Sequence, residues 1–503
     1  MMMMMIKEAS SVEQRAATTH LPQSEQERID ILLGNNQSRP VTLSSIQILG
    51  ANNTRKSFLN PFFQPLVEDS RNANYTLSEL MSKVGAAVRK LHAFDIFHPE
   101  ITVNISEPPQ FHPDTSPTDL DLTLRVRERS RVRLQTGTDV GNTEGSAYGN
   151  VLIRNIFGGA ESLSVNAATG TRTRSSYNAE FSTPVANNPN LKLSLDGLAS
   201  STQKPWASHE ELLKSGGLRL NWAKDNGDRY QVAFSSAWRQ LTGLSATASP
   251  SVRADAGDSV KNSISYMFLR DRRDNPMLPE KGYMVKSTTE LAGWGSLGGD
   301  VAFSKSEAEM SVAMPVTFPG AKTPSGISVS AGMRAGMLYP LPLSYGLTGA
   351  TLSRLNDRFT LGGPTDVRGF SLGGLGPRDG NDALGGDVFA AVSVSMFLPI
   401  PRTSPDSPFR IQLFANGGRS VAVRNHLSGS GRKQQLTSGS VWNGVLSATK
   451  DVVTGMPSIA AGVGLVYAHP VARFELNFSL PIVLRKSEEA RKGLQVGVGI
   501  NFL

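Results

Sequence analysis

The chain contains no cysteine and few histidines, and both scarcities limit the chemistry it can perform. Without cysteine it can form neither a disulfide framework nor a thiolate metal site. Its 7 histidines are scattered, and none has the paired spacing of zinc or iron ligands. No nucleophile elbow, metal pair or coordinated acid–base set stands out among its Asp and Ser residues. We therefore expect neither an enzyme nor a metal or cofactor site.

Long hydrophobic runs are also missing. No window of the sequence approaches the ~18 consecutive apolar residues that a transmembrane helix needs. This excludes membrane-spanning helices. It leaves a β-barrel open, because spanning strands show only an alternation of apolar and polar residues.

Signatures of nucleic-acid binding are missing as well, although the chain is basic. It has 51 Lys and Arg against 43 Asp and Glu, which gives a formal charge of +8 and a pI of about 9.6. No finger, basic zipper or aromatic-rich RNA signature accompanies this charge, so we expect no nucleic-acid partner. Many arginines alternate with apolar residues, which indicates either one basic face of a sheet or an ordinary solvated surface.

Residues 1–39 are polar and lack an apolar segment followed by a small-residue cleavage site, so they do not resemble a secretory signal. Five acids also argue against a cleaved mitochondrial presequence, which avoids them. These acids are Glu8, Glu13, Glu25, Glu27 and Asp30. We expect a mostly disordered leader with room for a short helix. If this is the native start, a bacterial outer-membrane protein is not expected.

Residues 40–129 have the pattern of a small α+β domain. The run VTLSSIQIL, which begins at Val41, predicts a strand, and GANNT predicts its turn. We expect the next segment, RKSFLNPFFQPLVE, to be helical only in pieces, because Pro61 and Pro65 interrupt it.

A clear amphipathic helix follows in YTLSELMSKVGAAVRKLHAF, where Thr76 and Glu79 have the spacing of a capping box. Its apolar face consists of Leu77, Leu80, Met81, Val84, Val88 and Leu91. Two alternating strands then run through residues 101–105 and 120–126. The order strand–helix–helix–strand–strand predicts a three-stranded sheet.

From residue 130 onward the helical period almost disappears, and runs of about ten residues alternate between apolar and polar positions. FELNFSLPI places Phe474 and Leu476 on one side and Glu475 and Asn477 on the other, and the final GLQVGVGINFL alternates in the same way. Other such runs are LKLSLDGLAS, RYQVAFSSAW, SISYMFLR and DVFAAVSVSMFL. Ten residues suit a tilted strand that crosses a bilayer. The strands of a soluble sandwich, the alternative here, average about five or six.

The length of this region predicts the number of strands. At about 22 residues per strand and connection, residues 130–503 hold 16 or 17 strands, and single-chain bacterial barrels are even-numbered. We therefore predict a mainly β protein, a 16-stranded antiparallel transmembrane β-barrel preceded by one small α+β domain.

One stretch, SVWNGVLSATKDVVTG, has helical spacing instead. Its apolar residues are Val441, Trp442, Val445, Leu446, Val452 and Val453. Ser440 can cap its start, and Gly455 with Pro457 can end it. The helix falls in a long connection between predicted strands 13 and 14. It either fills the loop or provides a docking surface, with Trp442 as the candidate contact.

LGGPTDVRGF, residues 361–370, lies in a glycine-rich segment with neither helical nor strand period. A phosphate-binding loop is one reading, but no Lys-Ser/Thr follows and no parallel βα unit surrounds it. The run Val367, Arg368, Gly369 and Phe370 resembles the signature of the BamA-like outer-membrane barrel-assembly superfamily. In that family the signature belongs to the sixth outer loop, which folds back into the lumen. The resemblance implies that Arg368 points at the inner wall.

The family's usual partner for this arginine is an acid in a Phe-x-Asp-x-Gly motif on strand 13. The matching residues here are Phe414, Asn416 and Gly418 of FANGG, so an asparagine replaces the acid. A charged bidentate pair is therefore not available at this position. We expect Arg368 to use neutral acceptors, or another acid such as Asp366 or Asp387.

Two further resemblances indicate which branch of the superfamily the chain resembles. DRRDNPMLPEKG, residues 271–282, resembles the family's turn between strands 8 and 9. Residues 40–129 resemble one polypeptide-transport-associated (POTRA) domain, ahead of the barrel at 130–503. A single such domain without an export signal points to the mitochondrial branch, the barrel subunits of the sorting and assembly machinery. This implies the mitochondrial outer membrane, with the POTRA domain in the intermembrane space.

For this branch the resemblance implies a membrane insertase. Unfolded β-barrel precursors would enter through a lateral gate between the first and last strands and pair there by β-augmentation. The expected gate residues are Arg133 and Thr136 in RVRLQTGTDV, and Gly493, Val496, Gly497 and Val498 in GLQVGVGINF. A polypeptide-translocating channel or pore of the same superfamily is the alternative. The other implied partners are membrane lipids and peripheral subunits on the cytosolic face, one of which Trp442 would contact.

The last strand has two further properties that fit this role. Its glycines weaken packing and favour bending, which would help a seam to part, although they would also ease curvature alone. Barrel precursors of this pathway carry a C-terminal signal of the form polar-x-Gly-x-x-apolar-x-apolar. The chain's own end fits it through Arg491, Gly493, Val496 and Val498. The resemblance thus implies that the chain is itself a substrate of the machinery.

Overall fold

The structure is a computed structural model of the 503-residue chain. It describes residues 34, 36–72, 75–106, 108, 116, 118–141, 144–317, 325–343, 349–402, 407–423, 438–470 and 472–499. Most of the expected leader lies outside these residues, as do residues 500–503, which the sequence pattern assigns to the last strand. The chain divides into two compact units, residues 1–129 with 157–160, and residues 130–156 with 161–503.

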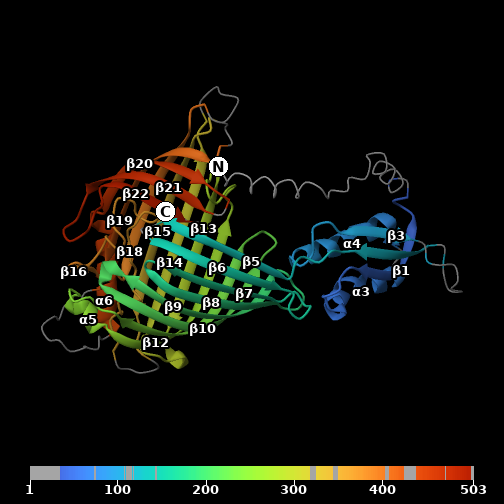
Figure 1. Cartoon of the computed structure of the whole chain (residues 1–503), viewed down its shortest axis with the longest axis horizontal. Helices are drawn as coiled ribbons and strands as arrows, with labels where there is room; N and C mark the ends of the chain where they lie inside the picture. Colours follow the sequence, from blue (N-terminus) through green and yellow to red (C-terminus); the bar gives the residue numbers. More distant parts are fainter. Residues whose placement is uncertain are drawn as a thin grey trace, which may run out of the picture. The chain divides into compact units, whose positions relative to one another are not determined.

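Over its described residues, the first unit is a small α+β fold of two helices and a four-stranded sheet (Figure 1). Its elements are β1 (Pro40–Leu49), α3 (Lys56–Asn72), β2 (Tyr75–Thr76), α4 (Leu77–His92), β3 (Thr102–Ser106) and β4 (Asp119–Arg125). The strand order is β2-β1-β4-β3, with β1 and β4 parallel and the other pairs antiparallel. Leu43, Leu122 and Leu124 of the sheet are buried in one cluster with side chains of both helices.

Helix α4 confirms the prediction from the apolar period and the capping box. Thr76 Oγ1 accepts a hydrogen bond from the backbone N of Glu79 at 3.3 Å, and Glu79 Oε2 accepts from the backbone N of Thr76 at 3.0 Å. These two bonds satisfy donors that a helix N-terminus otherwise leaves free. Leu80, Val84 and Leu91 then bury the predicted face.

The expectation of helical pieces before α4 is wrong, because α3 is one continuous helix of 17 residues. A proline in a helix interior costs about 3 kcal/mol. Pro61 and Pro65 lie with Ser57 on the exposed face, where water can bond the carbonyl groups that the prolines leave unpaired. The other face buries Phe58 and Phe63, each worth about 1.5–3 kcal/mol. This burial offsets the two missing hydrogen bonds.

The expectation of a three-stranded sheet is also wrong, by one short strand. Strand β2 consists only of Tyr75 and Thr76, which pair antiparallel with Val41 and Pro40 of β1. Two residues are too few to show an alternation in the sequence. Thr76 also caps α4, and the capping box predicts only a helix start at this position.

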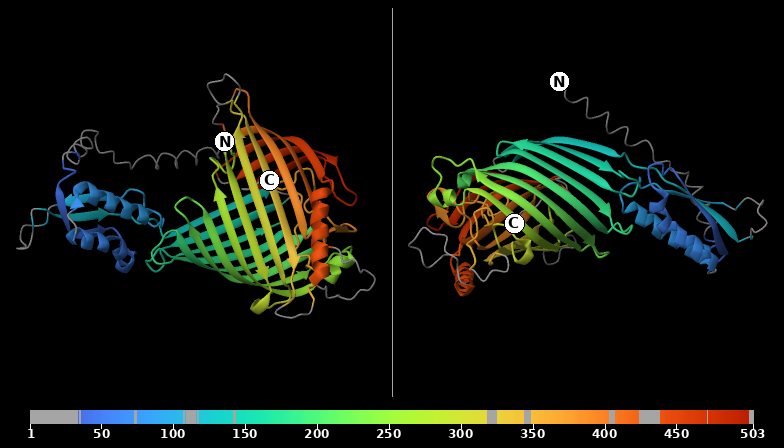
Figure 2. Two further views of the ribbon diagram at one scale, coloured as in Figure 1. Left: turned by 180° about the vertical axis from the view of Figure 1, so that it is seen from behind. Right: turned by 90° about the horizontal axis from the view of Figure 1, so that it is seen from below.

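The second unit is a 16-stranded antiparallel sheet, which confirms the predicted strand number. Its strands are β5 (Val132–Gly141), β6 (Glu144–Arg154), β7 (Ser162–Gly170), β8 (Thr173–Pro184), β9 (Leu191–Lys204), β10 (His209–Ala223), β11 (Arg229–Thr242), β12 (Gly257–Asp271), β13 (Gly282–Ala292), β14 (Phe303–Pro315), β15 (Ser328–Pro340), β18 (Val388–Pro399), β19 (Phe409–Val421), β20 (Ser458–Ala468), β21 (Arg473–Val483) and β22 (Gly493–Gly499). Each pairs with its neighbours in chain order, and the sheet curls until β22 contacts β5 (Figures 1 and 2).

The barrel has two ends, which we name the first end, where β5 begins, and the loop end, where β5 finishes. The loop-end connections carry the short elements η2 (Pro205–Ala207), α5 (Pro250–Ala254), η3 (Gly295–Leu297), β16 (Arg378–Asp379), β17 (Asp382–Ala383) and also α6 (Ser438–Thr454). As predicted, α6 lies between the thirteenth and fourteenth strands, β19 and β20. Residues 272–281 join the eighth and ninth, β12 and β13, as the resemblance implied. Within the described part of the chain, no helix has the length and apolar character needed to cross a membrane.

Burial along the strands is the inverse of that in a water-soluble sheet. On β21, Glu475 and Asn477 face the lumen and are buried, whereas Phe474 and Leu476 face outward. Glu475 is 1% exposed and Phe474 is 39% exposed. Leaving such an apolar belt in water would cost about 25 cal/mol per Å², a cost that a bilayer removes. The sandwich alternative is therefore wrong, and the sheet is a membrane-spanning barrel.

Candidate functional site

The long connection between β15 and β18 returns into the barrel, as the resemblance implied. In its middle, Val367, Arg368 and Phe370 are fully buried. Val367 and Phe370 belong to the same apolar cluster as the inward-facing Phe389 of β18. Leu361 forms a β-bridge with Leu375 and closes this segment on itself. We refer to residues 361–376 as the lumen loop.

A carboxylate on the fifteenth strand holds Arg368. Its Nε donates to Oε2 of Glu475 at 2.8 Å, and its Nη2 donates to Oε1 at 3.1 Å. Arg473 lies 2.5 Å from the same carboxylate, and Asn477 donates to it at 2.7 Å. All four residues are buried, so solvent screens these charges little and each depends on the others.

The two acids expected to serve this arginine are engaged elsewhere, so both are wrong as its partner. Asp366 lies in the lumen loop and accepts from Nη1 of Arg334 on β15 at 3.0 Å. Asp387 accepts from the backbone N of Val423 at 2.8 Å and fixes the end of β19 beside the start of β18. Asp366 therefore anchors the lumen loop to β15, and Asp387 anchors the base of the connection.

The predicted wall residues on β19 do meet the lumen loop. The ring of Phe414 lies 5.3 Å from the Arg368 guanidinium carbon. Asn416 Nδ2 donates to the carbonyl oxygen of Arg368 at 3.3 Å, so it binds the backbone of the arginine and not its charge. A Cβ atom at Gly418 would lie 2.8 Å from Cδ2 of Leu361, which explains why a glycine fits here. The structure thus brings together all of the predicted loop and wall residues.

The tip of the lumen loop is also bonded to the C-terminal edge of the sheet. Phe370 forms a β-bridge with Ala490, and the backbone N of Arg491 donates to the carbonyl of Gly369 at 2.9 Å. Gln495 of β22 accepts from the backbone N of Gly369 at 2.9 Å and donates to the carbonyl of Phe370 at 3.3 Å. Gly369 has a φ of 87°, which glycine adopts readily. One side chain of the last strand thus fixes two successive residues of the motif.

The predicted gate residues lie on the two end strands of the sheet. They are Arg133 and Thr136 on β5, and Gly493, Val496, Gly497 and Val498 on β22. Over the described residues the sheet order ends at these strands, and no hydrogen-bonded ladder joins them. A cavity of about 1050 Å³ lies beside β22, lined by Gln495, Phe370 and loop-end residues such as Arg172 and Trp206. Their role as a gate remains a prediction.

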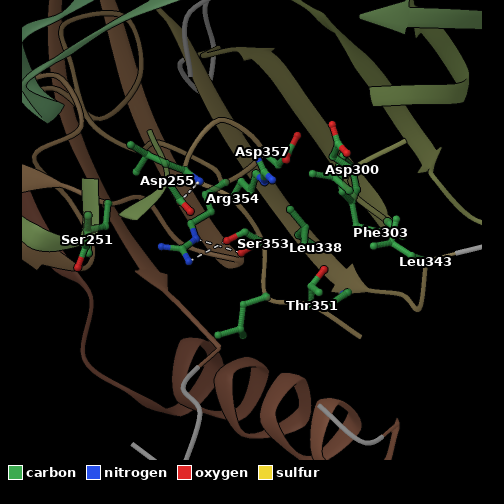
Figure 3. A pocket seen from close by; sticks show the side chains of 17 residues that line it. Ser251, Asp255, Asp300, Phe303, Leu338, Leu343, Thr351, Ser353, Arg354 and Asp357 are labelled. Atoms are coloured by element: carbon green, nitrogen blue, oxygen red, sulfur yellow. Dashed lines mark hydrogen bonds between the residues drawn. The ribbon is translucent and has the colours of Figure 1, made fainter. Parts of the chain in front are cut away.

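A second cavity of about 490 Å³ lies at the loop end, among the connections β11–β12, β13–β14 and β15–β18 (Figure 3). Its polar groups are bonded to these connections. Asp255 accepts from the backbone N of Leu355 at 2.9 Å, and Arg354 donates to the carbonyl of Asp258 at 3.3 Å. The cavity therefore lies where the loop-end connections are hydrogen-bonded to one another. No cluster of three or more His, Asp or Glu that could hold a metal ion occurs among the described residues.

Four residues of this site are not predicted from the sequence: Arg473, Glu475, Asn477 and Gln495. All four occupy lumen-facing positions of strands that the alternation predicts. The available signal is a polar or charged side chain on the polar side of a spanning strand. That signal marks many residues, and only the path of the lumen loop selects these four.

Known proteins resemble this chain in sequence and in fold. Residues 155–502 match the model of the Omp85 superfamily domain. A SAM50-like protein of Schizosaccharomyces pombe is 39% identical over 476 residues, which cover 94% of this chain and 93% of that protein. The human sorting and assembly machinery component 50 homolog is 30% identical over 435 residues, which cover 85% and 84%. BamA of Haemophilus ducreyi, in a crystal structure lacking POTRA domains 1–3, has the same fold with a TM-score of 0.68. That match covers 91% of this chain and 84% of that one at 14% identity.

A transmembrane sheet curled into a barrel, with a buried arginine loop in its lumen, defines an outer-membrane barrel of the assembly class. The family model and the relatives agree with this class. The chain belongs to the Omp85 superfamily and, within it, to the family of sorting and assembly machinery component 50 proteins. It is accordingly an assembly factor of the Omp85 type.

Proposed function

We propose that this chain folds and inserts β-barrel precursors into the mitochondrial outer membrane, and that precursor strands enter between β5 and β22. The observation that supports this proposal is the pair of sheet ends that no ladder joins over the described residues. Each unpaired backbone group in hydrocarbon costs several kcal/mol. Both edges therefore favour an added strand, which a precursor can supply by β-augmentation.

The glycines of the last strand support the same proposal. Gly493 and Gly497 offer no side chain to pack against a neighbour. An edge of this kind gives up few contacts when the seam parts.

The location and partners follow from the family and belong to the same proposal. Relatives are named as a component or subunit of a sorting and assembly machinery, which supports a multi-subunit complex. We place this complex in the mitochondrial outer membrane. We place the α+β unit in the intermembrane space as a POTRA domain. The loop end then faces the cytosol, where peripheral subunits of the complex would bind. The substrates are unfolded barrel precursors led by their own C-terminal strand.

Disulfide crosslinking can test this entry route, because the chain has no cysteine of its own. Thr136→Cys introduces one thiol on β5, and single cysteines are placed along the last strand of a precursor. We expect crosslinks during import that form at alternate precursor positions and in one register, since paired strands repeat every two residues.

Val232→Cys on β11 is the matched control. Val232 is exposed on the outer face of the barrel, but its strand is paired on both sides. It should give no register-specific crosslink. If Thr136→Cys also gives none while precursors still assemble, the seam stays shut and the lateral route is wrong. The alternative, passage of polypeptide through the lumen, would then be preferred.

A further inference from the structure

Helix α6 packs on the outside of the barrel wall at the loop end (Figure 2). Val388 of β18 and Val421 of β19 point outward by the alternation of their strands, yet Val388 is buried. They are covered because Val441 and Val445 of α6 pack against them in one apolar cluster. The outward-facing Arg419 also donates to the backbone just after the helix, at 3.3 Å. This is the side of the barrel that faces lipid.

The helix has three distinct faces. The face toward the barrel is apolar and buried and comprises Val441, Val445 and Ala448. The face away from the barrel is polar and exposed and comprises Asn443, Ser447, Lys450 and Thr454. Between them runs an apolar stripe of Trp442, Leu446 and Val453, which are 58%, 55% and 78% exposed. At about 100° per residue these three side chains point within about 40° of one another. We refer to them as the outer stripe.

Aromatic residues on the outer surface mark the membrane boundary at the first end of the barrel. The rings of Trp222 and Tyr230 stack there at 5.3 Å, and those of Phe409 and Tyr467 at 4.6 Å. Spanning barrels carry such aromatic girdles at both interfaces, because amphipathic rings favour the level of the lipid headgroups. A second girdle is therefore expected at the loop end.

Strands β18 and β19 carry no aromatic side chain at the loop end of their outer face. The outward positions there are Val388, Ala390, Arg419 and Val421. Helix α6 covers this patch and brings Trp442 to it. The outer stripe also continues the exposed apolar belt of the same strands, which includes Val392 and Leu413.

We propose that α6 is an interfacial helix whose outer stripe inserts into the lipid bilayer at the loop end. Lipid, and not a protein subunit, is the occupant of this surface. Trp442 supplies the girdle residue that β18 and β19 lack, and the polar face with Lys450 remains in the headgroup layer and water. This inference depends on the barrel spanning a membrane and is independent of the insertase role.

Tryptophan fluorescence of the full chain in phosphatidylcholine vesicles tests the proposal. The vesicles carry bromine, a short-range quencher, either near the headgroup end or near the tail end of the acyl chains. The difference between wild type and Trp442→Phe isolates the emission of one of the 5 tryptophans. We expect this difference to be quenched by bromolipid, more strongly by the shallow bromine, and to be protected from aqueous iodide.

A matched variant moves the probe around the same helix. Ser447→Trp in the Trp442→Phe background places the indole on the polar face, about 140° from position 442. It should be quenched by iodide and not by bromolipid. If the emission of Trp442 is instead quenched by iodide, the stripe faces water and the proposal fails. A photocrosslinker at position 442 that joins a peripheral subunit in the intact complex, and not lipid, would also overturn it in favour of a protein contact.

Discussion

The lumen loop is hydrogen-bonded to one end strand of the barrel, β22, whereas the inner face of the other end strand, β5, is exposed. On β22 the inward-facing Gln495 is buried and bonded to Gly369 and Phe370. On β5 the inward-facing Arg133 and Gln135 are exposed, and outward-facing Val132 and Leu134 are 57% and 68% exposed. One side of the seam thus has a packed and bonded interior, whereas the other has neither.

The seam between β5 and β22 is therefore held from the β22 side. The lumen loop ties β19, β21 and β22 into one rigid wall through Arg368, Glu475 and Gln495. Strand β5 is held by its ladder to β6. If precursors enter between β5 and β22 as we propose, the seam should part by movement of β5 and its neighbours while β22 keeps its place.

The largest expected effect comes from removing the carboxylate of the loop–wall contact. Glu475→Gln leaves two buried guanidinium groups, those of Arg368 and Arg473, without their anion. Breaking a buried pair in this way costs about 3–5 kcal/mol. Arg368→Ala should cost less, because Arg473 still pairs with the carboxylate. Urea unfolding of the folded barrel measures both losses, and precursor assembly should fall in the same order.

Glu180→Gln is the control for this prediction. Glu180 on β8 also faces the lumen and pairs with an arginine, Arg219, at 4.0 Å. Both side chains are about 30% exposed, so the pair should be worth less than about 1 kcal/mol. Equal losses for Glu475→Gln and Glu180→Gln would mean that the two walls do not differ.

The barrel could be predicted from the sequence because the same signal, an alternation of apolar and polar residues, recurs in strand after strand. Alternation over about ten residues identifies each strand, and the length of the region gives their number. The continuous helix α3 could not be foreseen, because local proline chemistry predicts a break at Pro61 and Pro65. Only the tertiary burial of Phe58 and Phe63 outweighs the cost of these two prolines inside the helix.

The site was predicted only in part, for a different reason. The motif around Arg368 and the wall residue Asn416 could be found, because each lies in a recognisable run. The acid Glu475 lies 107 residues from Arg368. Its position on β21 follows from alternation, but its meeting with the loop depends on how deeply the loop enters the lumen. No local pattern encodes that depth.

A smaller effect should follow from cutting the bond between the loop and the last strand. Gln495→Ala leaves the backbone N of Gly369 and the carbonyl of Phe370 buried without partners, at a cost of about 1–3 kcal/mol. Hydrogen exchange of the loop amides should rise by about tenfold, which corresponds to about 1.4 kcal/mol.

The matched change on the other end strand is Gln135→Ala. This glutamine also faces inward, but it is exposed, so the loop amides should exchange as in wild type. Faster loop exchange in Gln135→Ala, equal to that in Gln495→Ala, would show that both strands hold the loop. The asymmetry of the seam would then be lost.

The smallest effect concerns the asparagine that replaces the family's acid. Oδ1 of Asn416 is buried and has no hydrogen-bond partner among the described residues, and this residue already contacts the backbone of Arg368. In the Glu475→Gln background, Asn416→Asp should therefore offer the guanidinium of Arg368 a replacement anion and recover about 1 kcal/mol of the lost stability. In the wild-type background the same change adds an acid near Glu475 and should destabilise slightly. A double-mutant cycle in urea measures the coupling. If the two changes are simply additive, the arginine cannot turn to β19, and its place on the wall is fixed by β21 alone.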